Sequence, residues 1–245
     1  MESSYYTAVN WPAPRWVRAV STKRPGGVSL GPWASMNLGD HCGDVPDFVH
    51  QNRRLVSAEL GGEPLWLRQV HGSEVVREER FSLEADARVI RSTGVRAGIL
   101  TADCLAVLFC HQTEKVVAAA HAGWRGLAGG ILEATMRSMA VNPTEILVWL
   151  SPAIGPSVFE VGEDVRRVFL IKNVQYAKYF TEHQAGRWLL DIFALARYIL
   201  LGMGIRAVYG GGLCTVGLPQ EYFSYRRDLG VTGRMGSFIW IAEDS

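Results

Sequence analysis

The sequence lacks the features that mark several common classes of protein. Its 245 residues include four cysteines, which are too few and too scattered for the disulfide framework of a secreted domain. No apolar run approaches the roughly 18 residues that a membrane span needs. The N-terminal segment also lacks the basic and then apolar pattern of a signal peptide. We therefore expect a soluble, cytoplasmic protein with reduced thiols.

Net charge, repeats and linkers are lacking as well. The formal net charge of +1 gives no global field that would attract nucleic acid or an anionic membrane. Hydrophobic residues make up 48% and charged residues 20% of the chain, and these ordinary globular values argue against disorder. No repeat, low-complexity tract or Pro/Ser-rich linker divides the sequence. We expect one domain over residues 1–245 that binds neither nucleic acid nor membrane, and the oligomeric state stays open.

Apolar segments of strand length alternate with amphipathic segments of helix length, which predicts a mixed α/β fold. We expect helices over residues 46–60, 127–139, 162–169 and 190–201. We expect long strands over residues 97–110, 115–122 and 145–155, two strand pieces that meet at His71-Gly72, and a last strand within residues 223–243.

The stretch "KVVAAAHAGWRGLAGGIL" is the most informative part of the chain, because an apolar strand runs into His121 among many small residues. The four residues before Lys115 are short enough for a hairpin. If Cys110 faces Lys115, the register places Cys104 directly opposite His121 on one face of the sheet. A one-residue bulge would destroy this alignment.

A third candidate metal ligand is His71 in "RQVHGSE". Two histidines and one cysteinate form a tetrahedral zinc site with one open position, which is the pattern of a catalytic site. Such a zinc ion activates water and polarises a substrate atom. The same donor set also suits copper. Two alternatives need no metal: satisfied core residues, or a Cys104–His121 nucleophile and base pair that does not require His71.

Six segments together resemble one known family: "QVHG", "EADA", "TADCLAVLF", "AAAHAGWRGLAGGI", "PAIGPSVFEVG" and "FSYRRDLGVTGR". They are similar to the laccase-domain family, which is also described as multi-copper polyphenol oxidoreductase-like, as purine nucleoside phosphorylases and as peptidoglycan editing factors. The resemblance extends from Ser21 to "SFIWI" and so covers nearly the whole chain as one laccase-like domain. It implies a metal, usually zinc, held by His71, Cys104 and His121. One departure is Ala106, where the family usually has proline.

The resemblance also implies a fold and an activity. The fold is a four-layer α/β/β/α sandwich with mixed sheets, related to cytotoxic-necrotizing-factor-like cysteine hydrolases. The activity is phosphorolysis of adenosine, inosine and methylthioadenosine, with deamination of adenosine. Deamination needs an activated hydroxide at C6 of the purine, although the usual zinc-deaminase signature is absent.

Several further residues are candidates for binding substrate or phosphate. Arginine suits phosphate because its planar guanidinium binds an anion through two hydrogen bonds. The alternative roles are surface salt bridges for the arginines, a turn contact for Asn37 and a plain strand hydrogen bond for Gln69. Asp86 can orient a group or stabilise a turn. Asp103 can support the metal site or make a contact within a buried strand or loop. Adjacent His41 and Cys42 are better explained by loop structure than by a second metal site. The candidates for substrate or phosphate are Asn37, Gln69, Arg125, Arg226, Arg227 and Arg234.

Three other functions compete with the nucleoside enzyme. A hydrolase that removes a misincorporated amino acid from a peptidoglycan precursor would use the same zinc site to attack an amide. A copper-dependent polyphenol oxidase ranks lower, because the chain has six histidines and no His-x-His pair. A non-catalytic binding module would turn over none of these substrates.

Overall fold

The computed structural model describes residues 5–77 and 84–243. Its largest sheet has six strands in the order β12-β8-β6-β7-β4-β3. Strands β3 and β4 are parallel, as are β12 and β8, whereas β6 is antiparallel to both β7 and β8. The strand bounds are β3 (Val75–Arg77), β4 (Ala87–Ile90), β6 (Leu105–His111), β7 (Val117–Ala122), β8 (Ile146–Leu150) and β12 (Ala207–Gly210). The mixed α/β class is therefore confirmed.

A second sheet has four antiparallel strands in the order β1-β2-β13-β5. These strands are β1 (Tyr6–Thr7), β2 (Val17–Thr22), β5 (Arg96–Thr101) and β13 (Met235–Ile241). The last strand, β13, thus lies between two strands from the first half of the chain. All seven of its residues are buried.

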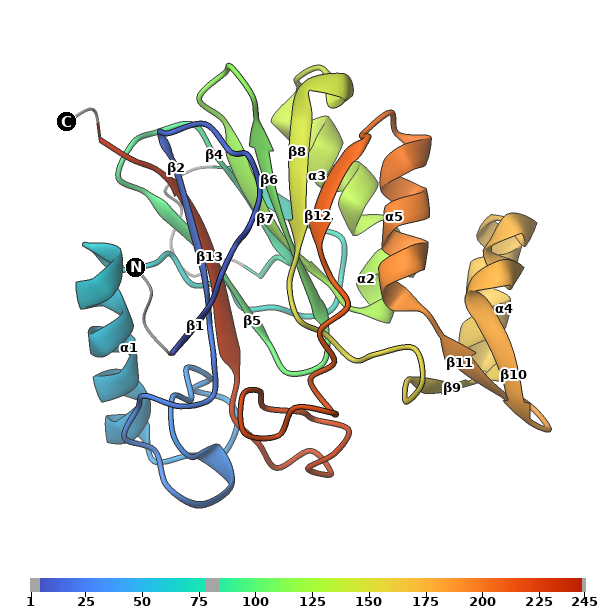
Figure 1. Cartoon of the computed structure of the whole chain (residues 1–245), viewed down its shortest axis with the longest axis horizontal. Helices are drawn as coiled ribbons and strands as arrows, with labels where there is room; N and C mark the ends of the chain where they lie inside the picture. Colours follow the sequence, from blue (N-terminus) through green and yellow to red (C-terminus); the bar gives the residue numbers. More distant parts are fainter. Residues whose placement is uncertain (1–4, 78–83, 244–245) are drawn as a thin grey trace.

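The two sheets face each other, and helices cover their outer faces (Figure 1). Helix α1 (Pro46–Leu60) lies outside the four-stranded sheet, while α2 (Trp124–Gly129), α3 (Ile131–Met139) and α5 (Ile192–Gly202) lie outside the six-stranded sheet. Side chains such as Ile99, Ala106 and Ile239 fill the space between the sheets. Every residue of β6 and β7 is buried, as expected for strands that are covered on both faces.

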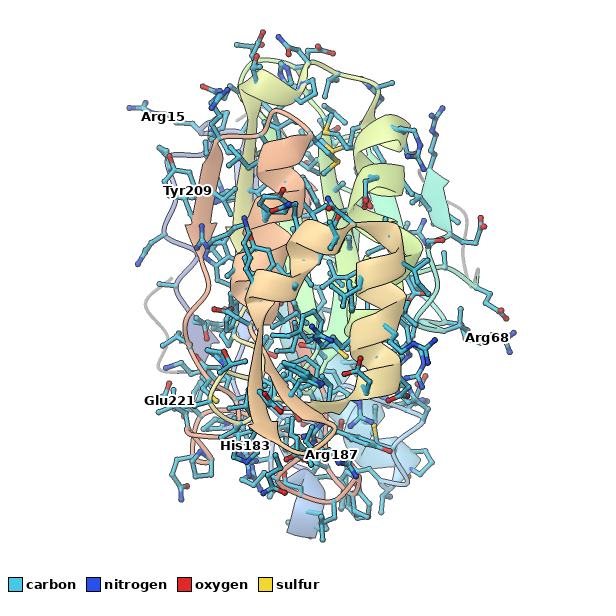
Figure 2. All side chains as sticks on the ribbon, turned by 90° about the vertical axis from the view of Figure 1, so that its right-hand side faces the viewer. Arg15, Arg68, His183, Arg187, Tyr209 and Glu221 are labelled. Carbon is cyan, nitrogen blue, oxygen red and sulfur yellow. The ribbon has the colours of Figure 1, made fainter. Side chains whose placement is uncertain are left out.

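A third, smaller sheet lies to one side of this body (Figure 1). Its order is β10-β11-β9, with β9 (Glu160–Gly162), β10 (Phe180–Gln184) and β11 (Arg187–Leu190), and it packs with α4 (Glu163–Lys172). Figure 2 looks onto this part and shows His183 and Arg187 near the turn of the β10–β11 hairpin. Three short 3-10 helices complete the described elements: η1 (Gly31–Trp33), η2 (Pro143–Glu145) and η3 (Val174–Tyr179).

Four predicted elements differ from those observed. The predicted strand 145–155 is shorter, because β8 ends at Leu150. The predicted strand 97–110 is two strands, because the chain leaves the four-stranded sheet after Thr101 and enters the six-stranded sheet at Leu105. The predicted helix 127–139 is interrupted at Gly130, whose φ of 89° is left-handed and ends α2. No strand forms at His71-Gly72, which lie in a bend. The helix predicted over residues 46–60 is confirmed with the same bounds.

Among residues 5–77 and 84–243, no helix has the length and apolar character to cross a membrane. The expected relation to cytotoxic-necrotizing-factor-like hydrolases stays a prediction, as does the division of the chain into a single domain.

Candidate functional site

The structure brings the three predicted ligands together. One ligand atom each from His71, Cys104 and His121 lie within 4.8 Å of one another. The Cys104 Sγ atom is 4.0 Å from His71 Nε2. The two imidazole rings meet edge to face, with centroids 4.7 Å apart. His121 is buried, Cys104 is half-buried and His71 is exposed, so the cluster is open to solvent on one side.

The register that predicted this meeting is wrong by two residues. Strand β6 places Ala106, not Cys104, opposite His121, and Cys110 pairs with Val117. A shift of two residues keeps every side chain on its face of the sheet, whereas a shift of one would reverse it. His121 therefore still points into the space between the sheets. Cys104 reaches it from the crossover that precedes β6.

Gly123 makes room for the thiol. A Cβ atom at this position would lie 2.9 Å from Cys104 Sγ and 3.4 Å from the His71 ring. Real Cβ atoms do not approach sulfur so closely, and both neighbours belong to the cluster. The glycine after "HA" in the sequence is thus needed for close approach, as its small neighbours suggested.

Ala106, the departure from the family's usual proline, sits beside the cluster. Its N–H donates to Ser151 Oγ at 2.9 Å, and its carbonyl accepts from the Ser151 N–H at 3.0 Å. Proline has no N–H and could not make the first of these bonds. The substitution therefore adds a hydrogen bond to the start of β6 and leaves the three ligands in place.

Asp86 organises two of the three predicted ligands from a fully buried position. Its carboxylate accepts a hydrogen bond from His121 Nδ1 at 2.8 Å, which directs the Nε2 atom toward the cluster. The same carboxylate accepts the backbone N–H groups of Val70, His71 and Gly72 at 3.2, 3.0 and 2.7 Å. These bonds hold His71 at a φ of 60°, in the left-handed region. A carboxylate behind a ligating histidine is the usual support of a metal site.

The cluster favours an ionised thiol. Burial by itself would raise the pKa of Cys104, but the charge and hydrogen bond of His121 and the hydrogen bond of His71 lower it to about 6. Burial would likewise lower the pKa of His121, but Cys104 and Asp86 raise it to about 9. The pKa of Asp86 is lowered as well, because the hydrogen bonds from His121 and Gly72 outweigh its burial. At neutral pH the site therefore presents a thiolate, which is the form that binds metals.

The cluster opens into a cavity of about 1180 Å³. Its walls come from both sheets, from α2, from the β8–β9 connection and from the loop before β13. Positive side chains predominate over the two exposed acids, Asp40 and Glu63. The five arginines that line it are Arg53, Arg68, Arg125, Arg226 and Arg234. Arg68 lies at the outer edge of the molecule (Figure 2). A cavity lined by arginines suits a substrate that is an anion or that reacts with phosphate.

Four of the six predicted substrate residues line this cavity: Gln69, Arg125, Arg226 and Arg234. Gln69 is engaged in a strand-like contact, because its side-chain amide bonds both the N–H and the carbonyl of Leu100 at 2.8 Å. The Arg125 guanidinium stacks on Trp124, 4.3 Å from the ring centroid. The Arg234 guanidinium lies over Tyr225 at 5.6 Å.

Asn37 and Arg227 lie away from the cavity lining. Asn37 is fully buried, and its amide oxygen accepts the N–H groups of Gly39 and Arg234 at 2.9 Å. The Arg227 guanidinium bonds the carbonyls of Thr215 and Tyr222 and the adjacent Asp228. Both side chains hold loops together, and a direct contact of either with substrate stays a prediction.

The sequence did not single out Arg53, Trp66 or Tyr225, although all three line the cavity. The Arg53 guanidinium lies 4.4 Å from the Trp66 ring centroid and 3.1 Å from Asp40. These residues come from α1, the segment after it and the loop before β13, and no local motif links them. To find them, one would have had to predict that α1 packs against the four-stranded sheet near its edge strand β5.

His41 and Cys42 follow the loop interpretation. His41 is exposed and contacts Asp40 at 3.3 Å. The Cys42 carbonyl accepts the indole N–H of Trp33 at 3.0 Å. No group of three metal-ligating side chains forms around this pair in the described part of the chain.

The chain is similar to known proteins over nearly its whole length. The model of the family described as multi-copper polyphenol oxidoreductase laccase matches residues 18–242. The purine nucleoside phosphorylase YfiH of Escherichia coli is 48% identical, with 94% of this chain and 96% of that protein covered. The purine nucleoside phosphorylase PA4543 of Pseudomonas aeruginosa is also 48% identical, over 96% and 97%. The crystal structure of NMB0706 from Neisseria meningitidis has a TM-score of 0.95 and 44% identity, covering 98% of this chain and 100% of that one.

Proposed function

The chain belongs to the multi-copper polyphenol oxidoreductase laccase family, and from this premise we propose that it is a zinc-dependent purine nucleoside enzyme. Its reaction is the phosphorolysis of adenosine, inosine and methylthioadenosine to the free base and ribose 1-phosphate. Deamination of adenosine is proposed for the same site. The observation that carries the proposal is the near full-length similarity to proteins named purine nucleoside phosphorylase, combined with a His/Cys/His cluster in an arginine-lined cavity.

The residues present fit a zinc ion. A tetrahedral ion with bonds of about 2.0–2.3 Å places its ligand atoms roughly 3.3–3.8 Å apart, and the Cys104–His71 separation of 4.0 Å is close to this. The donor set of two imidazoles and a thiolate leaves one position for water or substrate. Asp86 supplies the support behind His121 that such sites use. When bound, zinc supplies a Lewis acid that polarises substrate atoms in the open position.

The chain's own residues would bind and orient the reactants. In phosphorolysis the bond between the purine N9 and C1′ of the ribose breaks, a phosphate oxygen bonds to C1′, and the purine takes up a proton. The cavity arginines Arg125, Arg226 and Arg234 hold the phosphate and neutralise its charge. Asp86 holds a proton on His121 Nδ1, so that Nε2 would be the atom that ligates the ion when zinc is bound.

The other functions are placed behind this one. Residues 5–77 and 84–243 contain this one group of three His, Cys or acidic ligands, whereas a multicopper oxidase needs several copper centres. The relatives compared above are named for nucleoside phosphorolysis, so peptidoglycan-precursor editing ranks second. A metal-free Cys104–His121 pair would not need the third ligand, and the test below separates it.

The proposal also covers the fold, the domain organisation and the location of the protein. We interpret the order of helix, two sheets and helices as the four-layer sandwich that the resemblance implies. We also propose a single laccase-like domain and a cytoplasmic location, in keeping with the free thiols of all four cysteines.

The first experiment measures the products of adenosine by chromatography, with and without phosphate, and records the zinc content of each protein. Adenine that forms only with phosphate, or inosine, supports the nucleoside activity. We expect Cys104→Ala and His71→Ala to lose both zinc and product. His183→Ala is the matched control, because this exposed histidine lies on the β10–β11 hairpin (Figure 2) and should retain both.

Two outcomes would contradict the proposal. If wild-type protein binds zinc and leaves adenosine intact, the metal site is supported but adenosine is not the substrate. If His71→Ala keeps both zinc and activity, the three-ligand site is refuted and the Cys104–His121 pair is favoured.

A further inference from the structure

Asp103, next to the ligand Cys104, is bonded to a distant part of the chain. Its carboxylate accepts the Thr215 hydroxyl at 2.5 Å, the Ser224 hydroxyl at 3.0 Å and the Arg226 N–H at 2.7 Å. All three donors belong to the loop between β12 and β13, more than a hundred residues away in sequence. The side chain is buried, with 7% of its surface exposed, and so these bonds are shielded from water.

The backbone at Asp103 is shaped for this contact. Its φ of 83° is in the left-handed region, which non-glycine residues rarely adopt. Its carbonyl accepts the N–H of Ile154, a further cavity residue, at 2.9 Å. The main chain of Asp103 thus contacts one wall of the cavity while its side chain contacts another. A rarely populated conformation that is fixed by several bonds persists because the surroundings determine it.

The bonds to Ser224 and Arg226 fix the residues on either side of Tyr225. We name Tyr225 and Arg226 the substrate wall, because both side chains line the cavity. Tyr225 is 55% exposed, while the buried cavity aromatic Phe159 is 7% exposed. The Arg226 guanidinium lies 5.7 Å from the Phe159 ring centroid, and Nη2 donates to the Glu160 carbonyl at 2.9 Å. The wall therefore offers an aromatic ring and a guanidinium cation to the cavity that both residues line.

The arginines of the loop before β13 differ in how they connect to the cluster. The Arg227 guanidinium is engaged within its own loop. Arg234 is bonded through its N–H to Asn37, and its Nη1 to the carbonyls of Thr232 and Gly233. Arg226 alone among these three has its main chain bonded to the neighbour of a ligand. Its main chain is thus held next to Cys104 by the Asp103 carboxylate, while its guanidinium also bonds the Glu160 carbonyl.

We propose that Asp103 is a positioning residue: it holds Arg226 at a fixed distance from Cys104, and Arg226 binds the phosphate or another tetrahedral anion next to the metal cluster. Tyr225 is held by the same bonds and offers its ring to the planar base. This inference rests on the proposed function for the identity of the anion. The contacts of Asp103 and the placement of the substrate wall do not depend on it.

The test uses zinc-loaded protein and inorganic phosphate, with the dissociation constant of phosphate measured by titration calorimetry. Asp103→Ala removes all three acceptor contacts, and we expect phosphate to bind about 10- to 100-fold more weakly. Asp103→Asn is the conservative variant. Its amide oxygen can still accept the Arg226 N–H while its amide nitrogen donates to the Thr215 hydroxyl, so binding should return to within about threefold of wild type. Zinc content should be unchanged in both variants.

A double-mutant cycle shows whether Asp103 acts through Arg226. In an Arg226→Ala background, Asp103→Ala should weaken phosphate binding by less than about twofold. If Asp103→Ala does not fold, Ser224→Ala removes one donor to the same carboxylate and should weaken binding in the same direction. Thr135→Val is the control, because it removes a buried hydrogen bond on α3, away from the cavity, and lowers the melting temperature without changing phosphate binding.

Three results would overturn the inference. The first is that wild-type protein binds no phosphate. The second is that Asp103→Ala weakens phosphate binding by the same factor in the Arg226→Ala background as in wild type. The third is that Thr135→Val weakens phosphate binding as much as Asp103→Ala does. A wild-type protein that binds phosphate through Arg226 but leaves adenosine intact would refute the proposed phosphorylase activity and leave the role of Asp103 standing.

Discussion

Replacing Asp86 by asparagine tests how the cluster is organised. The Asp86 carboxylate accepts four hydrogen bonds, from His121 Nδ1 and from the N–H groups of Val70, His71 and Gly72. Asparagine offers one oxygen and a nitrogen that only donates. Each carboxylate oxygen accepts two of these bonds, so the amide nitrogen would face two N–H donors in either orientation. Two buried donors therefore lose their acceptor, and the negative charge opposite His121 is lost as well.

The expected effect has two parts. A buried donor without a partner destabilises by about 1–3 kcal/mol, so the free energy of unfolding of metal-free protein should fall by roughly 2–4 kcal/mol. Loss of the carboxylate behind a ligating histidine should weaken zinc binding about 10- to 100-fold. The pKa of Asp86 is lowered in the folded state, so its stabilising contribution is present above the unfolded pKa and is lost in acid. The stability difference between the two proteins should therefore shrink below about pH 4.

Urea unfolding of metal-free protein and zinc competition with a chromophoric chelator measure the two parts separately. Asp44→Asn is the matched control, because its carboxylate also accepts three hydrogen bonds, from Ser29, Asn37 and Val45, and lies outside the cavity lining. We expect the control to lose stability and to keep its zinc affinity. Equal zinc affinities in wild type and Asp86→Asn would refute the role given to Asp86.

Two further predictions concern the thiol. In metal-free protein the thiol of Cys104, with its pKa of about 6, should react with iodoacetamide at a rate that is constant above about pH 7 and falls in acid, and zinc should protect it. Burial raises the pKa of Cys110 to about 12, so that thiol should stay unreactive. A reaction rate of Cys104 with iodoacetamide that keeps rising up to about pH 9 would contradict its lowered pKa. Gly123→Ala places a Cβ atom against Sγ and should weaken zinc binding at least about tenfold by the same chelator assay. Gly129→Ala, where a Cβ atom meets nothing closer than 3.7 Å, should bind zinc like wild type.

The sequence was sufficient for the elements that depend on local signals. Helix α1 begins at Pro46 and ends before Gly61 because proline is favoured at the first turn of a helix and glycine takes the left-handed position after it. The break in the predicted strand 97–110 was not predictable in this way. Asp103 is the one residue there of a type that favours turns, and a single aspartate does not distinguish a turn from a strand. The chain turns there because β5 and β6 belong to different sheets.

The meeting of His71, Cys104 and His121 could be predicted although the register could not. The predicted pairing leaves four residues between the paired ends of the hairpin, and the observed pairing leaves six. Because these numbers differ by two, the same side chains face the space between the sheets in both registers. The contacts of Asp103 with Thr215 and Arg226 were beyond prediction, because they join segments that no periodicity relates. Asp86 was only partly predictable. Its motif "EADA" is visible in the sequence, but the four groups that it bonds are known only from the tertiary structure.

The position of β13 has a consequence for how the protein is made. β13 pairs with β2 on one side and β5 on the other, so residues 102–234 must be synthesised before the four-stranded sheet can close. Until then β2 and β5 each present an unpaired edge to solvent or to a chaperone, and such edges promote aggregation. Removing residues 235–241 would therefore affect the first half of the chain more than the second. A ribosome-bound intermediate that lacks this strand should be the species most in need of chaperone protection.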